Sequence, residues 1–378
     1  MIWTNNSINK LSLSKDAVSK YGKKLKIVYT PLHGTGVTLV PAILQRLGFT
    51  NVTMVKEQAI NDGNFPTVKS PNPEEKSALE MAIALAKDID ADIVMATDPD
   101  ADRVGIAVRM DGWCRFWGQW MLLNGNQTAS VLTYYLVNQW KVNNKLIGKE
   151  FIVKTIVTSE LIKDIAERNG VKSYDVLTGF KFIADKIKEL EGKEVFIGGG
   201  EESYGYMIGD FVRDKDAVST CAMIAEIAAW AADNGKTFFD VLIDLYKEYG
   251  FYKEDLLSMT KKGKSGNEEI KQMMVDYRSN PPKEIAGSKV VCIKDYQLQT
   301  STNLQTGDVE SIVLPKSNVL QFFTEDGSKV SVRPSGTEPK IKFYFGVKGE
   351  LTNPEDFDAV NNALDSKIKA IKTSLNLE

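Results

Sequence analysis

Short apolar runs alternate with segments of helical periodicity from Lys24 onward, and this alternation limits the possible folds more than any other feature of the chain. Gly48 marks the end of the first helical segment. The N-terminal part of the pattern predicts strands at Leu25–Tyr29 and Val52–Val55, helices at Val37–Leu47 and Glu74–Lys87, and a strand that ends at Asp98. Strands and helices that alternate in this way form parallel sheets with crossover helices.

The pattern restarts after the helix predicted at Thr128–Trp140, which we expect to close the first unit. Ser159 is a candidate N-cap. The second unit is predicted to contain strands at Phe151–Val157, Lys172–Leu177 and Val195–Ile197, and helices at Glu160–Asn169, Phe180–Glu191, Ala217–Asp233 and Phe238–Tyr249. Beyond Gly263–Gly266, short strands up to Ile341–Val347 are grouped apart from helices, which is typical of an α+β domain.

The predicted fold class is therefore two tandem α/β units with mixed or parallel sheets and crossover helices, followed by a smaller α+β C-terminal domain. The expected bounds are a leader or linker at 1–23, an α/β unit at 24–142, a second at 143–262 and the α+β domain at 263–378.

Charge and cysteine content narrow the function classes. A formal net charge of −3 and a pI near 5.6 argue against nucleic acid as a partner, because phosphate-backbone binding requires a basic surface. Three widely spaced cysteines without a CxxC pair fit a reducing compartment, and we expect the cytoplasm. Neither a signal peptide nor a membrane span is expected. The single histidine, His33, excludes multi-histidine zinc chemistry, and no feature predicts an oligomeric state.

The most informative motif is Thr97-Asp-Pro-Asp-Ala-Asp-Arg103, which we call the Asp loop. It follows an apolar run at 91–96 that is typical of a buried strand. The carboxylates of Asp98, Asp100 and Asp102 can converge on one hard cation. Arg103 can offset surplus negative charge or bind a phosphate. The alternative is a solvated acidic turn, because Asp-Pro is common in turns.

Two further loops carry groups suited to a sugar. In Gly198-Gly-Gly-Glu-Glu-Ser-Tyr-Gly205, the glycines let the backbone approach a ligand closely. Glu201 and Ser203 of this loop offer an acceptor and a donor for hydroxyl groups. The turn Thr178-Gly-Phe-Lys181 adds a hydroxyl and a lysine, although such turns occur throughout α/β proteins. The alternative for the first loop is a flexible β–α turn with a capping glutamate.

Near the C-terminus, Arg333-Pro-Ser-Gly-Thr-Glu-Pro-Lys340 gathers an arginine, two hydroxyls and a glycine amide. This combination favours an oxyanion cradle over a tight surface turn. Gly34-Thr-Gly36 lacks the third glycine and the P-loop lysine, so it does not favour nucleotide binding. His33 beside it is more typical of a loop residue than of a catalytic base, and Arg213-Asp-Lys-Asp216 is typical of a charged surface turn.

Taken in order, five motifs resemble those of the α-D-phosphohexomutase superfamily, and specifically its phosphoglucomutase/phosphopentomutase branch. The resemblance extends from about Leu25 to the C-terminus and covers the last three of the four family domains. The motifs are Ser70-Pro-Asn-Pro-Glu74, Thr97-Asp-Pro-Asp-Ala-Asp-Arg103, Gly200-Glu-Glu-Ser-Tyr-Gly205, Arg213-Asp-Lys-Asp216 and Arg333-Pro-Ser-Gly-Thr-Glu-Pro339.

The resemblance implies an enzyme that moves a phosphoryl group between two positions of one sugar through a phosphoserine and a bisphosphorylated intermediate. Mg²⁺ is the implied cofactor, and a sugar phosphate is the implied small-molecule partner. The implied residues are the metal ligands Asp98, Asp100 and Asp102, the catalytic residues Arg103 and Lys215, and the substrate-binding residues Thr178, Gly179, Glu201, Ser203, Arg333, Ser335, Gly336, Thr337 and Lys342. Lys342 stands where the family often has an arginine, and it keeps the charge without the bidentate fork.

One departure from the family concerns the nucleophile. The family's phosphorylated serine lies in an N-terminal domain, in a Thr-x-Ser-His-Asn-Pro-like loop, and this sequence has no such loop. Ser70 belongs to the family's second domain and is not a candidate. We therefore expect the 378-residue chain to be inactive alone, either as a fragment of a longer enzyme or as a truncated gene product.

The leading functional hypothesis is a phosphoglucomutase that interconverts glucose 1-phosphate and glucose 6-phosphate. Phosphopentomutase and phosphomannomutase remain alternatives, because the motifs do not identify the sugar. A non-catalytic sugar-phosphate-binding or metal-binding module is a competing hypothesis, since the covalent relay requires the serine. An aspartate-nucleophile phosphatase would use the Asp loop but would leave the other motifs without a role.

Overall fold

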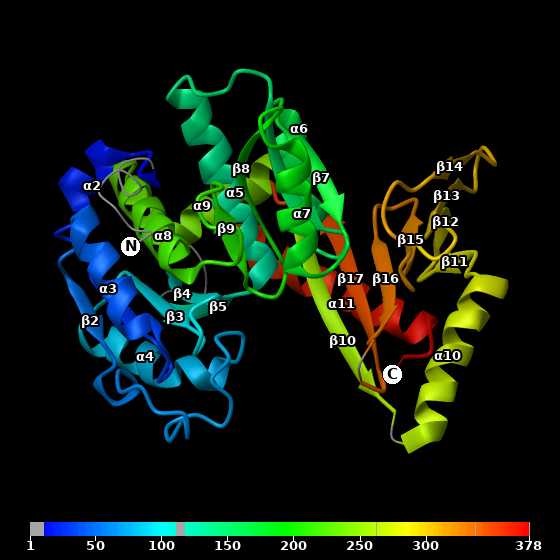
Figure 1. The fold of residues 1–378 in the computed structure, drawn as a ribbon, viewed down its shortest axis with the longest axis horizontal. Helices are drawn as coiled ribbons and strands as arrows, with labels where there is room; N and C mark the ends of the chain where they lie inside the picture. The colour runs from blue at the N-terminus through cyan, green and yellow to red at the C-terminus, as the bar shows by residue number, and fades with distance from the viewer. Residues whose placement is uncertain (1–10, 111–117, 262, 337, 378) are drawn as a thin grey trace. The chain divides into compact units, whose positions relative to one another are not determined.

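The computed structural model describes residues 11–110, 118–261, 263–336 and 338–377. The chain divides into two compact units, which we call unit 1 (Met1–Tyr249) and unit 2 (Gly250–Glu378) (Figure 1). Within the described ranges, no helix is both long enough and apolar enough to cross a bilayer.

Unit 1 contains a five-stranded sheet in the order β2-β1-β3-β4-β5 (Figure 1). Its strands are β1 (Ile27–Thr30), β2 (Val52–Met54), β3 (Ile93–Thr97), β4 (Val104–Met110) and β5 (Gln119–Leu123). β1 pairs in parallel with β2 and β3, whereas β3–β4 and β4–β5 are antiparallel, so the sheet is mixed. The sequence also predicts a strand pair at Val104–Val108 and Cys114–Trp117. The first lies within β4, the second lies outside the described residues, and β5 is the strand that pairs with β4.

Burial explains the apolar runs of this sheet. Every residue of β1 and β3 is buried, as expected for central strands covered by helices. The connecting helices are α3 (Gly36–Leu47), the short 3₁₀ turn η1 (Lys56–Gln58) and α4 (Lys76–Asp88). α4 packs on β1 and β3. Gly48 ends α3 in a left-handed conformation with φ +107°, which confirms the predicted helix stop.

The second sheet of unit 1 has four strands in the order β7-β6-β8-β9. They are β6 (Glu150–Thr155), β7 (Lys172–Val176), β8 (Val195–Gly200) and β9 (Tyr206–Ile208), and the helices that follow the pattern are α5 (Gly125–Val142), α6 (Glu160–Arg168), α7 (Phe180–Leu190), α8 (Ala217–Asp233) and α9 (Phe238–Tyr249). β6 is parallel to β7 and β8, and β9 is antiparallel to β8. Ser159 caps α6 as predicted, because its side chain accepts the Leu161 N–H at 3.2 Å.

Two long helices pack against sheets that their sequence order did not predict. α5, which we assigned to the unit at 24–142, packs on β8 and α6 of the second sheet. α8, which we assigned to the unit at 143–262, packs on β9 of the second sheet and also on α3, β3 and β4 of the first. α8 is buried along most of its length, as expected for a helix that is apolar on all sides. α8 therefore contacts both sheets, and the two sheets lie in one compact unit.

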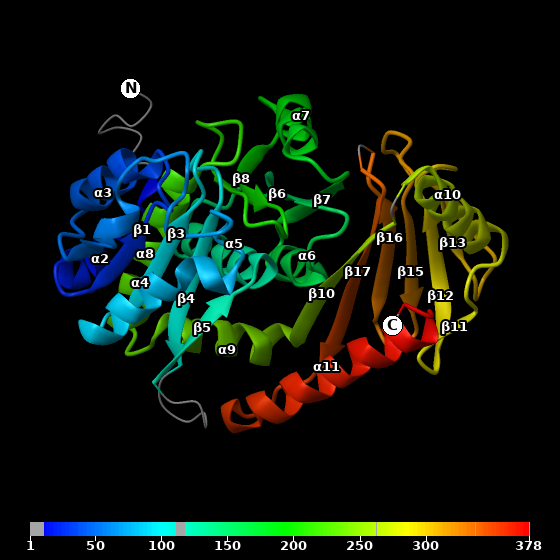
Figure 2. The same ribbon diagram turned by 90° about the horizontal axis from the view of Figure 1, so that it is seen from below.

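The described strand pairs of unit 2 are all antiparallel, and its helices are grouped apart from them, which confirms the predicted α+β class. The strand order is β10-β17-β16-β15-β12-β13-β14, with β11 beside β12. Its elements are β10 (Phe251–Thr260), α10 (Gly263–Ser279), β11 (Glu284–Ile285), β12 (Ser288–Asp295), β13 (Thr300–Asn303), β14 (Val309–Ser311), β15 (Leu320–Thr324), β16 (Lys329–Pro334), β17 (Lys340–Gly349), η2 (Pro354–Asp356) and α11 (Phe357–Ser374). Figure 2 shows α11 along β10 and β17, against which it packs.

Both ends of unit 1 differ from the predicted bounds. Residues 15–21 of the predicted leader form α2 (Lys15–Tyr21), which packs on α8. The buried carboxylate of Glu226 in α8 accepts the backbone N–H of Leu13 at 2.7 Å just before this helix. At the other end, β10 pairs along its whole length with β17, so the break between the units lies after Tyr249 instead of near residue 263.

Candidate functional site

The Asp loop closes on its own first carboxylate. The apolar strand β3 ends at Thr97, and Asp98 Oδ1 then accepts the backbone N–H of Asp102 at 3.0 Å and of Arg103 at 2.9 Å. The turn requires Ala101 to adopt a left-handed conformation with φ +56°, which costs a residue with a side chain about 1–2 kcal/mol. Strain of this kind is found where a loop must hold functional groups in place.

The three aspartates form a compact oxygen cluster. Asp98, Asp100 and Asp102 each offer a carboxylate oxygen, and these oxygens lie within 4.8 Å of one another. Burial, followed by the charges of Asp102 and Asp100, raises the pKa of Asp98 to about 7. Among the described residues, Asp102 Oδ1 is buried and has no hydrogen-bond partner, and Arg103 Nε lies 3.7 Å from it. Carboxylate oxygens are the kind of ligand that Mg²⁺ and Ca²⁺ bind, so the residues present fit such a cation.

A neighbouring turn supports the Asp loop from behind. Thr35 donates its N–H at 2.8 Å and its hydroxyl at 3.0 Å to the carbonyl of Pro99. A Cβ added to Gly34 would lie 2.3 Å from the Pro99 Cα, so only glycine fits there. Both ring nitrogens of His33 are hydrogen-bonded, to Ile60 O at 3.0 Å and Thr67 Oγ1 at 2.8 Å. The Gly34-Thr-Gly36 motif thus positions the Asp loop.

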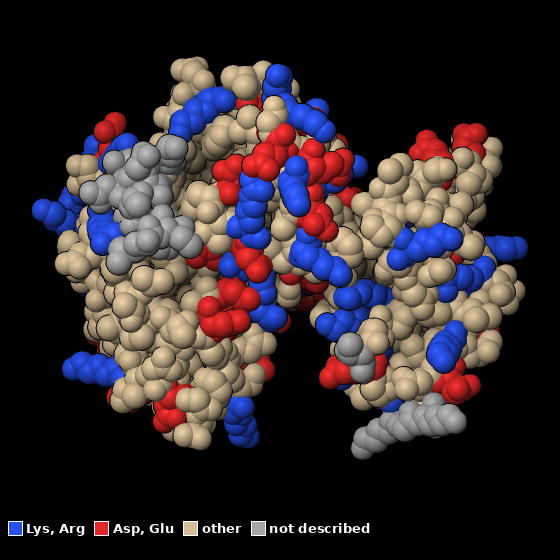
Figure 3. Space-filling view, viewed as in Figure 1, with Lys and Arg blue, Asp and Glu red and all other residues tan. Residues whose placement is uncertain are grey.

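Two cations lie against the aspartates. Arg103 donates to Glu74 Oε1 at 3.1 Å, and its Nε lies 3.7 Å from Asp98 Oδ2. Lys215 forms an ion pair with Asp102 Oδ2. Its aliphatic chain crosses Gly205, where an added Cβ would lie 2.4 Å from the Lys215 Cδ. Figure 3 shows acidic and basic side chains gathered together on this unit.

The β8–β9 connection brings a second loop to the same place. We call residues Glu201–Gly205 the Glu loop. Val104 donates its backbone N–H to Tyr204 O at 3.0 Å, and Arg103 forms an isolated β-bridge with Gly205. The Glu loop and the Asp loop are therefore hydrogen-bonded to each other through the start of β4.

Within the Glu loop, Glu201 is turned toward the Thr178–Lys181 turn. Glu201 Oε1 accepts the Gly179 N–H at 2.8 Å, and only 9% of the residue is exposed. Burial, with a further contribution from the charge of Glu202, raises the pKa of Glu201. Gly179 has φ +117°, which explains the glycine at the entrance to α7. Thr178 and Ser203 are half-buried beside these residues.

Three residues of the Arg213–Asp216 segment make contacts in three different places. Lys215 reaches the Asp loop, as described above. Arg213 instead pairs with Glu191 on the surface, with 2.6 Å between Nη2 and Oε1. Asp216 caps α8 by accepting the N–H groups of Val218 at 3.0 Å and Ser219 at 3.3 Å.

The remaining predicted residues belong to unit 2. Arg333 on β16 and Lys342 on β17 lie directly opposite each other in the antiparallel ladder. Like charges in this position repel, and an anion bound between them would remove that repulsion. In the connecting turn, Ser335 N donates to Lys340 O at 2.7 Å, and Gly336 is exposed. Thr337 lies outside the described residues.

The sequence-based nominations missed residues that act behind the loops. Glu74 pairs with Arg103, although we used it only as part of a motif. Glu202 accepts hydrogen bonds from the hydroxyls of Thr155 and Thr158. Two features of the sequence could have indicated the role of Glu202. They are the adjacent pair Glu201-Glu202 and the two threonines at the end of a predicted strand.

Known protein families match this chain in three consecutive segments. Residues 5–112 match the phosphoglucomutase/phosphomannomutase α/β/α domain II, residues 124–249 match α/β/α domain III, and residues 270–362 match the C-terminal domain. The second match includes α5, in agreement with the packing of this helix on β8.

Curated relatives from staphylococci are similar over most of the chain. A phosphoglucomutase of Staphylococcus haemolyticus is 39% identical over 337 residues, which cover 89% of this chain and 59% of the relative. A phosphoglucomutase of Staphylococcus aureus is 41% identical over 324 residues, which cover 86% of this chain and 57% of the relative. The chain thus spans less than three fifths of the length of these relatives.

Solved structures agree on the fold. A putative phosphomannomutase from Thermus thermophilus superposes with a TM-score of 0.64 at 17% identity, covering 98% of this chain and 64% of that one. Parafusin, a phosphoglucomutase from Paramecium in an open form, gives a TM-score of 0.62 at 17% identity, covering 97% and 61%. With three successive domain matches in order, the chain belongs to the phosphoglucomutase/phosphomannomutase family.

Proposed function

We propose that the enzyme to which this chain belongs is a phosphoglucomutase, which interconverts glucose 1-phosphate and glucose 6-phosphate through a phosphoserine and a bisphosphate intermediate. The observation that carries the proposal is the meeting of the Asp loop, the Glu loop and the Gly179 turn in unit 1. The staphylococcal relatives that carry this name add support at about 40% identity.

Mg²⁺ is the proposed cofactor, held by Asp98, Asp100 and Asp102. The support is the oxygen cluster within 4.8 Å and the buried Asp102 oxygen, which has no hydrogen-bond partner in the part of the chain that the structure describes. When bound, Mg²⁺ supplies positive charge that offsets the charge on a transferring phosphoryl group.

The protein's own residues would orient the substrate and hold its charges. Arg103 and Lys215 are positioned by ion pairs with the Asp loop, and each would bind oxygens of the phosphoryl group. Glu201 and Ser203 would bind sugar hydroxyls, with Thr178 and Gly179 beside them. In unit 2, the non-reacting phosphate would be held by Arg333, Ser335, Gly336, Thr337 and Lys342.

The setting we propose is a reducing compartment, the cytoplasm, with a small sugar phosphate as partner. The described cysteines, Cys221 and Cys292, are both free, which supports this setting. Because the proposed relay needs a phosphoserine and this sequence lacks the family's serine loop, we expect the 378-residue chain to bind sugar phosphate without turnover.

The test is a mutase assay on the full-length enzyme with Mg²⁺ and a glucose bisphosphate primer. Glucose 1-phosphate, ribose 1-phosphate and mannose 1-phosphate are compared at equal concentration, and we expect the highest kcat/KM for glucose 1-phosphate. The 378-residue chain serves as the matched control and should give no product. Absence of turnover on either glucose phosphate would contradict the proposed function, and turnover by the control chain would contradict the serine relay.

A further inference from the structure

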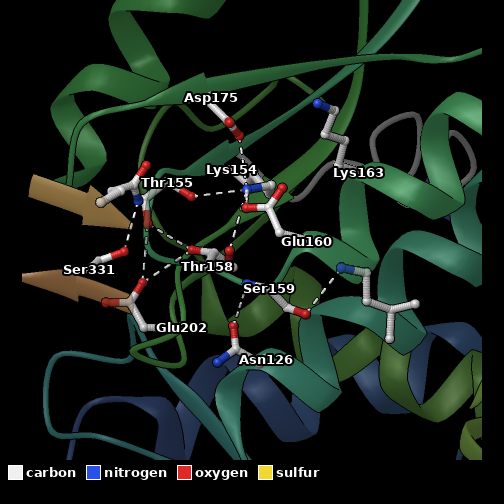
Figure 4. A network of polar contacts seen from close by, with 12 residues as sticks. Asn126, Lys154, Thr155, Thr158, Ser159, Glu160, Lys163, Asp175, Glu202 and Ser331 are labelled. Atoms are coloured by element: carbon white, nitrogen blue, oxygen red, sulfur yellow. Dashed lines mark hydrogen bonds and ion pairs between the residues drawn. The ribbon is translucent and has the colours of Figure 1, made fainter. Parts of the chain in front are cut away.

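A fully buried lysine lies behind the Glu loop. Lys154, at the end of the central strand β6, has no exposed side-chain surface. Its Nζ lies 2.9 Å from Asp175 Oδ1 and 3.2 Å from Glu160 Oε1, and it donates to Thr158 O at 3.3 Å. Figure 4 shows these groups converging on the Lys154 ammonium. A buried ammonium needs such partners, because desolvation of an unpaired charge is costly.

The lysine fixes the turn between β6 and α6. Besides its bond to the Thr158 carbonyl, Lys154 Nζ lies 3.4 Å from Thr155 O. Thr155 Oγ1 and Thr158 Oγ1 are 2.7 Å apart. At the far side of the turn, Ser159 N donates to Asn126 Oδ1 at 2.9 Å, which ties it to α5 (Figure 4). The two threonine hydroxyls are therefore held in fixed positions.

Both hydroxyls point to one carboxylate of the Glu loop. Thr155 Oγ1 lies 3.2 Å and Thr158 Oγ1 3.1 Å from Glu202 Oε2 (Figure 4). Hydrogen bonds to an ionised acceptor are stronger than those between neutral groups. The loop backbone is enclosed on its other side as well, because a Cβ added to Gly125 would lie 1.9 Å from the Glu202 carbonyl oxygen.

We propose that Glu202 is a positioning residue that fixes the Glu loop, so that its neighbours Glu201 and Ser203 meet the sugar hydroxyls of the substrate. The contacts run from Lys154 to the turn that carries Thr155 and Thr158, which we call the threonine turn, and from there to the Glu202 carboxylate. The positioning role is assigned to Glu202 because its carboxylate oxygen Oε2 accepts hydrogen bonds from two hydroxyls of the protein. This role rests on the proposed function for the identity of the ligand, and the contacts themselves do not depend on it.

The experiment replaces the hydroxyls and leaves Lys154 in place, since removing the lysine would leave two carboxylates without their buried partner. A double variant, Thr155→Val with Thr158→Val, keeps the side-chain shape. Hydrogen exchange followed by mass spectrometry on the 378-residue chain should show about 10- to 100-fold faster exchange of the amides at 199–207, because two hydrogen bonds to a charged group are lost. Glu202→Ala should produce the same local acceleration.

Three controls separate positioning from general stability. Thr155→Ser with Thr158→Ser keeps the hydroxyls and should exchange like the wild type. Glu189→Gln removes a negative charge from an exposed ion pair elsewhere in unit 1 and should also leave 199–207 unchanged. Exchange in β1 of the first sheet should not change in any variant. Equal acceleration in β1 and at 199–207 would mean that the network only stabilises the fold, and the proposal would fail.

Ligand binding gives the second measurement. Calorimetry with glucose 1-phosphate should give at least about tenfold weaker binding for the valine variant than for the serine variant. If the 378-residue wild type does not bind glucose 1-phosphate, the expectation that this chain binds sugar phosphate by itself fails, and the exchange data still decide the role of Glu202. Wild-type exchange at 199–207 in both the valine variant and Glu202→Ala would overturn the positioning role.

Discussion

The two groups of predicted site residues are built in different ways. In unit 1, each of the loops is held by groups outside it: Thr35 holds Pro99, Glu74 holds Arg103, and the threonine turn holds Glu202. In unit 2, the cradle depends on the strand ladder, which places Arg333 opposite Lys342, and its turn exposes Gly336. An added Cβ at Gly336 would meet no atom of the described residues within 4 Å, whereas one at Gly34 would meet the Pro99 backbone.

This difference has a physical consequence. Loops that are fixed before a ligand arrives lose little conformational entropy on binding, and they suit chemistry in which groups must be accurately placed. Two cations on adjacent strands suit a ligand group that needs only charge and a few hydrogen bonds, such as a non-reacting phosphate. We therefore expect substitutions in unit 1 to disturb several loops at once and those in unit 2 to act locally.

The largest expected effect comes from Asp98→Ala. This change removes a proposed ligand and also the acceptor of two backbone N–H groups of the Asp loop. We expect Mg²⁺ or Mn²⁺ binding to weaken by more than about 100-fold, since loss of an outer-shell partner alone costs about 10- to 100-fold. Activity of the full-length enzyme should be abolished, and the affinity for sugar phosphate should be largely retained.

Calorimetry of the 378-residue chain with Mn²⁺ measures this effect, and Asp90→Asn is the control. Asp90 is an exposed aspartate of the same unit that pairs with Arg109. Wild-type cation affinity in the Asp98 variant would exclude this residue as a metal ligand.

The second prediction concerns the cradle. Arg333→Ala should weaken glucose 1-phosphate binding by about one to two decades, because a charge-assisted contact to phosphate is worth about 1.5–3 kcal/mol. Arg333→Lys, which keeps the charge but loses the fork, should give an intermediate affinity. Cation binding should be the same in both variants, because the aspartates are in unit 1. Unchanged sugar-phosphate affinity, measured by calorimetry, would remove the cradle from the site.

The third prediction compares two glycines. Gly34→Ala should destabilise the chain by about 1–3 kcal/mol and weaken cation binding, because the new Cβ must displace the Pro99 backbone. Gly336→Ala should change stability by less than about 0.5 kcal/mol, because its Cβ enters open space. Urea unfolding measures both. Equal destabilisation by the two substitutions would contradict the difference between the regions.

The smallest expected effect is a shift in pH dependence. The pKa of Glu201 is raised by burial and by the charge of Glu202, while the Gly179 N–H and the charges of Lys215 and Arg103 lower it. Glu202→Gln removes one of the raising contributions, so Glu201 should stay ionised to lower pH.

Glucose 1-phosphate affinity measured across the acid range reports this shift. The midpoint of its acid limb should move to lower pH in the Glu202→Gln variant, and titration of the ligand phosphate is common to both proteins. A midpoint that moves to higher pH, or that does not move, would show that the Glu202 charge does not act on Glu201.

Local patterns predicted most of the elements and the loops on which the candidate residues lie. The apolar run before Asp98 gave a buried strand that ends at the Asp loop, and Ser159 is the N-cap that its position indicated. Such features depend on neighbours a few residues away, so periodicity and capping chemistry suffice. Membership of the family was predicted from five motifs that occur in the family's order. The roles of the individual site residues stay predictions.

Only the tertiary structure decided which elements meet. α8 is apolar on nearly all sides, so no stripe of its sequence indicated that it packs on the first sheet. The strand β10 looks like the end of the second unit, but its partner β17 lies about 80 residues later in the chain. Lys215 rather than Arg213 reaches Asp102, and Glu202 rather than Glu201 faces the threonines. These choices depend on contacts between residues distant in sequence, which local patterns do not encode.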